Sequence, residues 1–203
     1  MVVPQFVGVL SDPIELSTLV PTGEGTSDSV NIRVLDAFGR TIEGCEYTWN
    51  DWALDKPCWV DGDWNAITGV TFTAGQGLWV YGSSSSQGLQ SAGKVELSDV
   101  VVTLRSGATP TGNPFPVAIN LQDIVPQGEG TSDSVNIRVL DAFGRTVEGC
   151  DYTWNDWALG KACWVDGDWN EVTGVTFEPG QGLWVYGSSD AQSIRFPAPE
   201  IAE

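Results

Sequence analysis

The chain has 203 residues, of which 27 are acidic and 9 are basic, and its formal net charge at pH 7 is −18. Phosphate backbones and anionic lipids repel a protein this acidic, so nucleic acid is excluded as a direct partner. Histidine is absent, which excludes imidazole-based catalysis and most zinc sites. We therefore expect no enzymatic activity and no cofactor.

The first ten residues, MVVPQFVGVL, lack the basic start and the cleavage site of a secretory signal peptide. No apolar run approaches the ~20 residues that a membrane span requires, so we expect no membrane insertion. The abundance of Gly, Ser, Thr and Trp and the scarcity of Lys are nevertheless typical of extracellular proteins. A virion protein assembled in the host cytoplasm reconciles these features, and an extracellular or cell-surface protein is the alternative.

An internal duplication organises the chain. Residues 23–41 recur unchanged as residues 128–146, and the similarity continues to Ser83 and Ser188 at a constant offset of 105 positions. We expect module 1 over residues 1–105, with a repeat core at 13–84 and an extra C-terminal strand, then a linker over 106–116 and module 2 over 117–203. Two near-identical copies favour avidity for a repetitive ligand, or the tiling of a surface, over catalysis.

Apolar runs in both copies are short, are separated by Gly, Asp, Asn and Pro, and never hold a helical period. The predicted fold class is all-β, with two tandem β-sandwich modules of the jelly-roll or Ig-like type. Val30, Ile32 and Val34 alternate with polar residues in an early strand. Residues 36–39, Asp-Ala-Phe-Gly, then predict a type I turn with a G1 bulge.

The next hairpin signal is Asp61-Gly62 between apolar residues, which predicts a two-residue loop. Such a loop places Trp59 directly opposite Trp64, and the second copy repeats the arrangement with Trp164 and Trp169. Residues 78–81 are apolar on both faces, which predicts a central strand covered on both sides. The extra strand, in which Val100, Val102 and Leu104 alternate, either completes a sheet or bridges to module 2.

The cysteines are Cys45 and Cys58 in the first copy and Cys150 and Cys163 in the second, without a C-x-x-C motif. A spacing of thirteen residues allows a disulfide within each module, which would contribute about 2 to 4 kcal/mol. Two buried free thiols per module are the alternative, which assembly in a reducing cytoplasm favours.

Carboxylates and an amide follow one another in the pattern that opens a calcium loop, at Asp61, Asp63 and Asn65 and again at Asp166, Asp168 and Asn170. Ala66 and Phe72 stand where the motif needs glycine and a bidentate glutamate, so an EF-hand is excluded. The six residues are weak calcium candidates, and a solvated turn is the alternative. We predict no metal, cofactor or catalytic site.

Ten tryptophans, five in each copy, are the strongest functional signal. An indole offers a flat apolar face to the C–H groups of a sugar, and the same side chain is prominent at protein interfaces. We predict that Trp79 and Trp184 belong to the cores and that Trp52 and Trp157 are the most exposed. The candidate ligand or interface residues are Trp52, Trp59, Trp64, Trp157, Trp164 and Trp169.

The pair Phe115-Pro116 before a strand, the Trp-rich middle and the ending Gly-Gln-Gly-Leu-Trp-Val-Tyr resemble the tandem β-modules of bacterial surface proteins and of phage virion proteins. The resemblance covers both modules and implies a structural or display role. It assigns no functional residue.

These features predict a non-enzymatic structural or display protein on the outside of an assembly. The most concrete form is a bacteriophage virion accessory protein, such as a capsid decoration, tail or fibre component, whose partners are other protein subunits of an oligomeric assembly. The alternative is a carbohydrate-binding or adhesive module on a bacterial surface, which holds a cell-surface glycan on exposed Trp platforms. An S-layer or filament subunit with head-to-tail contacts is a third hypothesis.

Overall fold

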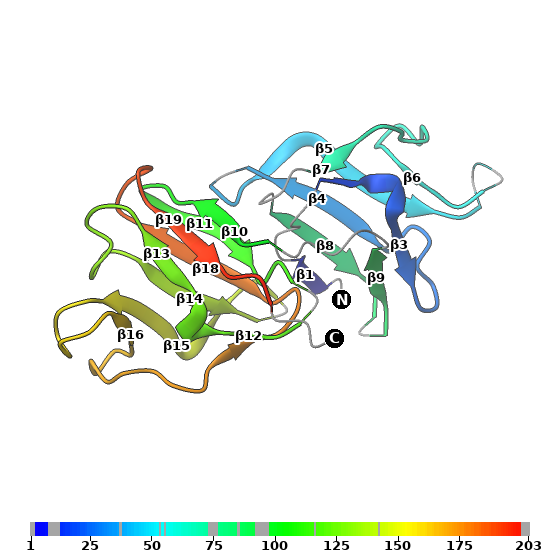
Figure 1. The fold of residues 1–203 in the computed structure, drawn as a ribbon. Coiled ribbons are helices and arrows are strands. Elements are labelled where there is room, and N and C mark those ends of the chain that lie inside the picture. The colour runs from blue at the N-terminus through cyan, green and yellow to red at the C-terminus, as the bar shows by residue number, and fades with distance from the viewer. Residues whose placement is uncertain are drawn as a thin grey trace.

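The computed structural model describes residues 3–7, 13–36, 38–52, 54, 56–72, 77–84, 86–91, 98–115, 117–141 and 143–199. Within these residues the structure is all-β, as predicted, apart from two single-turn 3₁₀ helices, η1 (Leu16–Thr18) and η2 (Leu121–Asp123). No helix in the described part has the length and apolarity to cross a bilayer. The chain forms two similar β modules that lie side by side (Figure 1).

Each module contains one five-stranded antiparallel sheet. In module 1 the strand order is β1 (Val3–Val7), β8 (Leu78–Gly82), β4 (Asn31–Leu35), β5 (Thr41–Asn50) and β6 (Cys58–Val60). In module 2 the order is β11 (Gly107–Gly112), β18 (Gly182–Gly187), β14 (Asn136–Leu140), β15 (Thr146–Asn155) and β16 (Cys163–Val165). Corresponding strands take the same places, so the duplication in sequence is also a duplication in structure.

Shorter antiparallel ladders form the other layer of each sandwich. In module 1 these are β2 (Ile14–Glu15) with β7 (Thr71–Phe72), and β3 (Leu19–Thr22) with β9 (Gly88–Ser91). In module 2, β12 (Ile119–Asn120) pairs with β17 (Thr176–Phe177), and a three-stranded sheet has the order β10 (Val100–Thr103), β19 (Ser193–Phe196), β13 (Val125–Gln127).

The hydrophobic core of each module lies between these layers. Along β4, Ile32 and Val34 are buried in the core while the neighbouring Arg33 is only half-buried, because successive side chains of a strand point to opposite faces. Trp59 of β6 crosses the core, and its indole N–H donates to the carbonyl oxygen of Leu19 at 2.8 Å. The buried indole thus finds a hydrogen-bond partner and joins the two layers.

The predicted turn lies between β4 and β5, where residues 36 and 38–40 are described. The N–H of Gly39 donates to the carbonyl of Asp36 at 3.0 Å, and Gly39 has a φ of 75°. The Asp36 Oδ1 atom accepts the backbone N–H groups of Phe38 and Arg40 at 2.8 and 2.9 Å. The closed turn and the left-handed Gly39 agree with the predicted hairpin, whereas residue 37, which decides the type of the turn, lies outside the described residues.

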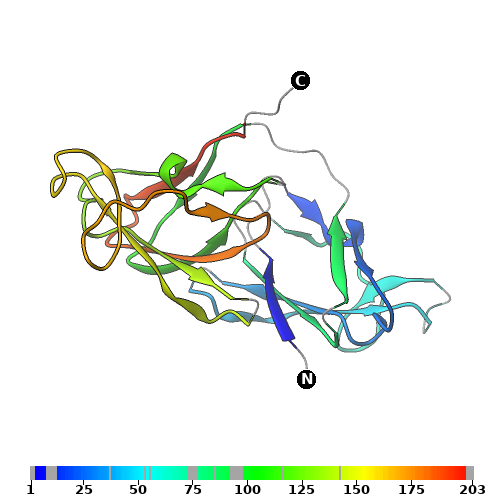
Figure 2. The same ribbon diagram turned by 90° about the horizontal axis from the view of Figure 1, so that it is seen from below.

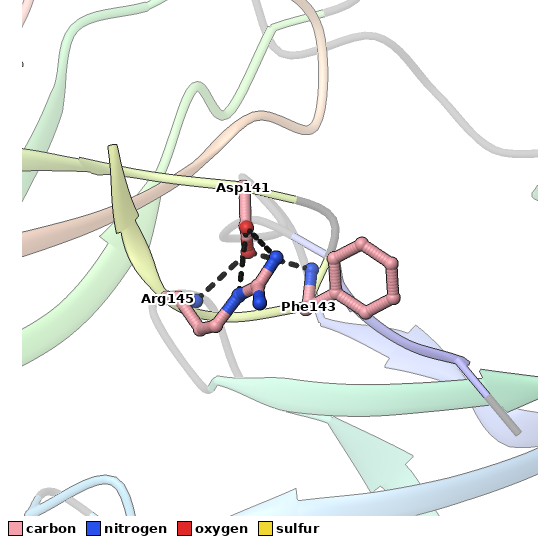
Figure 3. A network of polar contacts seen from close by, with 3 residues as sticks. All are labelled: Asp141, Phe143 and Arg145. Atoms are coloured by element: carbon pink, nitrogen blue, oxygen red, sulfur yellow. Dashed lines mark hydrogen bonds and ion pairs between the residues drawn. The ribbon is translucent and has the colours of Figure 1, made fainter. Parts of the chain in front are cut away.

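Figure 3 shows the same loop in module 2, where Asp141 accepts the backbone N–H groups of Phe143 and Arg145 and pairs with the Arg145 guanidinium. The backbone N–H of Arg145 is the main cause that holds the pKa of Asp141 below its usual value, and Arg40 has the same effect on the pKa of Asp36. An ionised aspartate therefore organises each loop.

Trp79 and Trp184 lie at the contact between the modules and not in the module cores, contrary to the prediction. Strand β8 lies between β1 and β4, as its apolar sequence predicted, and it sends Leu78 and Val80 into the core of module 1. Trp79 points to the other face, where it packs with Trp184 against a buried pair, Leu35 and Leu140. A pattern of apolar residues shows that a side chain is covered but does not show which surface covers it.

The junction between the copies also differs from the prediction. Residues 107–112, within the expected linker 106–116, form β11, which pairs along its whole length with β18 of module 2. The sequence there is Gly-Ala-Thr-Pro-Thr-Gly, and β11 is an edge strand, where proline is tolerated because only one side is paired. The expected extra strand of module 1 is β10, which joins module 2 by pairing with β19.

Candidate functional site

Each module presents two tryptophans in contact on its surface. Trp52 and Trp157 are 64% and 62% exposed, the highest values among the large hydrophobic side chains of the described residues, as predicted. Each faces a second indole that is 48% exposed. The ring centroids of Trp52 and Trp64 are 6.3 Å apart, and those of Trp157 and Trp169 are 6.1 Å apart. We call Trp52 with Trp64 the first exposed pair, and Trp157 with Trp169 the second exposed pair.

Trp52 follows the end of β5 and is held there by hydrogen bonds from both its side chain and its backbone. Its indole N–H donates to Asp28 Oδ2 at 3.0 Å, and its backbone N–H donates to Asn50 Oδ1 at 3.2 Å. Asn50 is fully buried, and its side-chain amide donates to Asp28 Oδ1 at 2.7 Å. These contacts fix the indole in one orientation although most of the ring is exposed.

Module 2 repeats this anchor almost atom for atom. The Trp157 indole N–H donates to Asp133 Oδ2 at 2.8 Å, and the Asn155 amide donates to Asp133 Oδ1 at 2.6 Å. Asp28 and Asp133 themselves have left-handed backbones, with φ of 59° and 61°. Aspartate tolerates this region better than most side chains. The sequence prediction did not identify these aspartates or the buried asparagines, although the segment Thr-Trp-Asn-Asp-Trp-Ala-Leu is identical in both copies.

Trp64 lies in a loop with the same hydrogen bonds as the loop at residues 36–40. Asp61 Oδ1 accepts the backbone N–H groups of Asp63 and Asn65, both at 2.9 Å, and the Trp64 N–H donates to the Asp61 carbonyl at 3.1 Å. In the first loop the fourth residue is Gly39, with a φ of 75°; in this loop the fourth residue is Trp64, with a φ of 64°.

A tryptophan in this left-handed conformation costs roughly 1 to 2 kcal/mol relative to a residue without a Cβ atom. Trp169 repeats the conformation in module 2, also with a φ of 64°. Neither ring contributes to a core, because both are about half exposed. Backbone strain that does not serve packing is typical of functional positions. The strain therefore marks the exposed pairs as the candidate site.

The predicted pairing of Trp59 with Trp64 is wrong. Trp59 and Trp164 are buried, at 2% and 1% exposure, and the strand register pairs Trp59 with Trp49, with the rings edge to face at a centroid distance of 5.4 Å. The loop is longer than two residues because the Asp61 carboxylate accepts two backbone N–H groups. Of the six predicted ligand or interface residues, Trp59 and Trp164 are core residues, and the structure brings the other four together in two exposed pairs.

The calcium candidates Asp61 and Asp166 have a structural role in these loops. The backbone N–H of Asn65 is the main cause that lowers the pKa of Asp61, and Asn170 does the same for the pKa of Asp166. The side-chain N–H₂ group of Asn65 also donates to Asp61 Oδ2 at 3.3 Å. The amide nitrogen therefore faces Asp61, whereas calcium binds oxygen atoms. Asp63 and Asp168 are exposed on the same turns. Over the described ranges, no three His, Cys, Asp or Glu side chains gather in a metal-binding group.

All four cysteines are free thiols, and the strand register explains why the disulfide alternative does not fit. Cys58 lies opposite Asn50, so Cys45 is five residues farther along β5. At about 3.3 Å per residue, this offset is roughly 16 Å, whereas a disulfide needs Cα atoms within about 7 Å. Cys150 and Cys163 have the same relationship in module 2.

Comparison with known proteins found no match, whether to a protein-family model, to a curated protein or to a solved structure. The chemistry of the site therefore rests on its own geometry. Each exposed pair offers two inclined aromatic faces beside the Asp28 or Asp133 carboxylate. Aromatic faces bind C–H groups and carboxylates accept hydrogen bonds from hydroxyl groups, so the site suits a ligand that carries both.

Proposed function

We propose that this protein is a non-enzymatic binding protein that attaches to a carbohydrate polymer through its two exposed tryptophan pairs. The observation that carries the proposal is the left-handed backbone of Trp64 and Trp169, which holds a large apolar ring at the surface against a second anchored indole. Folding alone would favour glycine at both positions. A ligand that stacks on the rings explains why tryptophan and not glycine occupies these two positions.

The charge of the chain narrows the ligand class. A net charge of −18 repels polymers that carry sulfate, phosphate or carboxylate groups. Neutral polysaccharides, or polymers of amino sugars, are therefore the favoured ligands. Pyranose rings of these polymers present patches of C–H groups to the indoles and hydroxyl or amide groups to the neighbouring carboxylate.

The two pairs are arranged for bridging. The segments β5–β6 and β15–β16, from which the pairs come, lie at opposite ends of the molecule (Figures 1 and 2). One chain can thus hold two polymer strands, or two distant stretches of one strand. Two linked sites can bind a repetitive ligand about 10² to 10⁴ times more tightly than one site when the geometry lets both engage.

A sedimentation assay on insoluble cellulose, chitin and a neutral α-glucan tests the proposal. The wild-type protein should co-sediment with at least one of them, and Trp52→Ala combined with Trp157→Ala should abolish retention. Phe38→Ala combined with Phe143→Ala is the matched control, because it removes exposed aromatic rings that lie outside the pairs. Retention of the Trp double variant at the wild-type level would refute carbohydrate binding by the pairs.

A second candidate function is a display protein on the outside of an assembly, such as a virion accessory protein. Phe38 and Phe143 favour it, because these aromatic rings are 60% and 45% exposed on equivalent turns, and exposed aromatic residues are enriched at protein interfaces. The partners would be other protein subunits. Light scattering after size exclusion tests this function: a defined oligomer supports it, and a monomer of 21.8 kDa that binds no particle contradicts it.

A further inference from the structure

The two modules differ at one sheet edge. In module 2, β19 has a partner on each side, β13 and β10. The corresponding strand of module 1, β9, pairs with β3 alone within the described residues. The repeat offset matches Gly88–Ser91 with Ser193–Phe196. The edge of β9 that corresponds to the β10 side of β19 thus has no strand among the described residues.

The backbone groups at this edge point away from β3. In module 2, the Leu104 N–H donates to the Gln192 carbonyl at 2.8 Å, and the register pairs Val102 with Ile194 and Val100 with Phe196. Hydrogen-bonded pairs alternate along an antiparallel ladder, so Ile194 and Phe196 bond toward β10.

Their equivalents in module 1 are Leu89 and Ser91. Leu89 lies opposite Pro21, which has no N–H group to donate, and Ser91 lies opposite Leu19, two positions along the same ladder. The N–H and carbonyl groups of Leu89 and Ser91 therefore face the open edge.

The side chains of β10 show what this edge can hold. Val100, Val102 and Leu104 are buried in the core of module 2, whereas Val101 between them is 54% exposed. Ile194 is also fully buried, but its equivalent Leu89 is only half-buried against the smaller core of module 1. A strand with apolar side chains at alternate positions would cover Leu89 and extend that core.

We infer that the open edge of β9 is a binding site for an extended peptide segment of another polypeptide, with the pattern Val-x-Val-x-Leu. The segment adds to the sheet as an antiparallel strand, in the register that β10 takes on β19. Main-chain hydrogen bonds supply affinity, and the alternate apolar side chains supply selectivity. This site is separate from the exposed tryptophan pairs and does not depend on what they bind.

One difference between the copies predicts selectivity in detail. In module 2 the Asp99 carboxylate pairs with the Arg195 guanidinium at 2.8 Å, but Gln90 stands in place of arginine in module 1. A peptide bound at β9 therefore gains no ion pair from an aspartate at this position. Its affinity should be unchanged when that aspartate is replaced by asparagine.

A synthetic peptide of residues 98–105, Ser-Asp-Val-Val-Val-Thr-Leu-Arg, tests the inference when titrated into the full ¹⁵N-labelled chain. The peptide should bind one to one and shift the amide signals of Leu89 and Ser91. A peptide with serine in place of Val100, Val102 and Leu104 should bind at least tenfold more weakly. Shifts confined to β19 would mean that the peptide displaces β10, and would contradict the inference.

Ser91→Pro is the decisive variant. It removes one N–H group from the open edge and none from the β3 ladder, so the module should stay folded while the peptide binds at least tenfold more weakly. Unchanged binding to Ser91→Pro, or no binding to the wild type at millimolar peptide, would overturn the inference. So would a wild-type dimer that Ser91→Pro converts to a monomer, because a second copy would then be the occupant of the edge.

Discussion

Gly39 of module 1 lies directly against the indole ring of Trp184 of module 2, and Gly144 of module 2 lies in the same way against Trp79 of module 1. The two contacts are equivalent under the repeat, and the Leu35–Leu140 pair packs with the same two tryptophans. Gly39 contacts Trp184, and the copy of Trp184, which is Trp79, contacts the copy of Gly39, which is Gly144. This reciprocity is the pattern of a two-fold symmetric dimer interface. This chain forms that interface within one polypeptide.

Gly39→Ala should weaken the contact between the modules, because a Cβ atom at this position would overlap the Trp184 ring. Gly44→Ala is the matched control, since Gly44 has nearly the same φ, 76° against 75°, and no atom within 4 Å of its added Cβ. Both variants incur the left-handed backbone cost of ~1 to 2 kcal/mol, and Gly39→Ala should lose a further 1 to 3 kcal/mol, roughly, from overpacking. Urea unfolding measures the difference, and equal losses would show that the contact contributes no stability.

Asp28→Ala should release the Trp52 indole and weaken ligand binding at the first exposed pair at least tenfold. The variant removes the acceptor for both the Trp52 indole N–H and the Asn50 amide. We expect the free energy of unfolding to fall by about 2 to 4 kcal/mol, since both lost hydrogen bonds involve a charged acceptor and one of them comes from the buried Asn50 amide. Glu43→Ala, which removes an exposed carboxylate from β5, should change neither quantity. Binding is best measured in a protein that also carries Trp157→Ala, so that only the first exposed pair contributes to the measured affinity.

The loop aspartates should make stability depend on acid pH. The pKa values of Asp36, Asp61, Asp141 and Asp166 are lower in the folded chain than their usual value of 3.8, chiefly because each carboxylate accepts a backbone N–H. A lowered folded-state pKa means that the unfolded chain binds the proton first. The stabilisation is therefore complete above pH 3.8 and is lost as the pH falls through the folded-state pKa values.

Asp36→Asn combined with Asp141→Asn should reduce this acid dependence by roughly half, because asparagine still accepts the two N–H groups but does not titrate, whereas Asp61 and Asp166 still do. Thermal unfolding between pH 2 and pH 6 provides the measurement. If the melting temperature of the wild type does not decrease when the pH is lowered from 3.8 to 2, the lowered pKa values are contradicted.

Four thiols should be titratable per chain without reduction. Iodoacetamide in denaturant, followed by mass spectrometry of the intact chain, should add four groups to protein purified without reductant. Cys45 and Cys58 are too far apart along their strands to join, as are Cys150 and Cys163. Two groups fewer, with Cys45 linked to Cys58, would show that the register of β5 and β6 is wrong.

The repeat, the all-β class, the turn at Asp36 and the exposure of Trp52 and Trp157 could be predicted from the sequence. The repeat follows from sequence identity at an offset of 105 positions, and the other features rest on local rules, such as glycine at a left-handed position. The loop at Asp61 has the same hydrogen bonds as the loop at Asp36, but Trp64 occupies the glycine position. A rule based on residue preference therefore predicted a shorter loop and placed Trp59 opposite Trp64.

The contacts between copies were harder to predict because they depend on which surfaces meet. Trp79 has the sequence pattern of a core residue, and only the packed structure shows that the other module covers it. Strand β11 was missed because it pairs with β18 through backbone groups, so its Gly-Ala-Thr-Pro-Thr-Gly sequence needs no apolar alternation that would identify a strand. The Asp28 anchor was missed because its partners Asn50 and Trp52 lie more than 20 positions away.

The proposed function requires that the strained tryptophans serve a carbohydrate ligand and not the fold. Trp64→Gly combined with Trp169→Gly tests it most directly, by measuring polysaccharide retention and urea unfolding on the same protein. Relief of backbone strain, ~1 to 2 kcal/mol per position, should offset the loss of each ring contact, about 0.5 to 1.5 kcal/mol, so stability should stay close to wild type. Retention should disappear. A double variant that unfolds much more easily, or one that still binds like the wild type, would contradict the account.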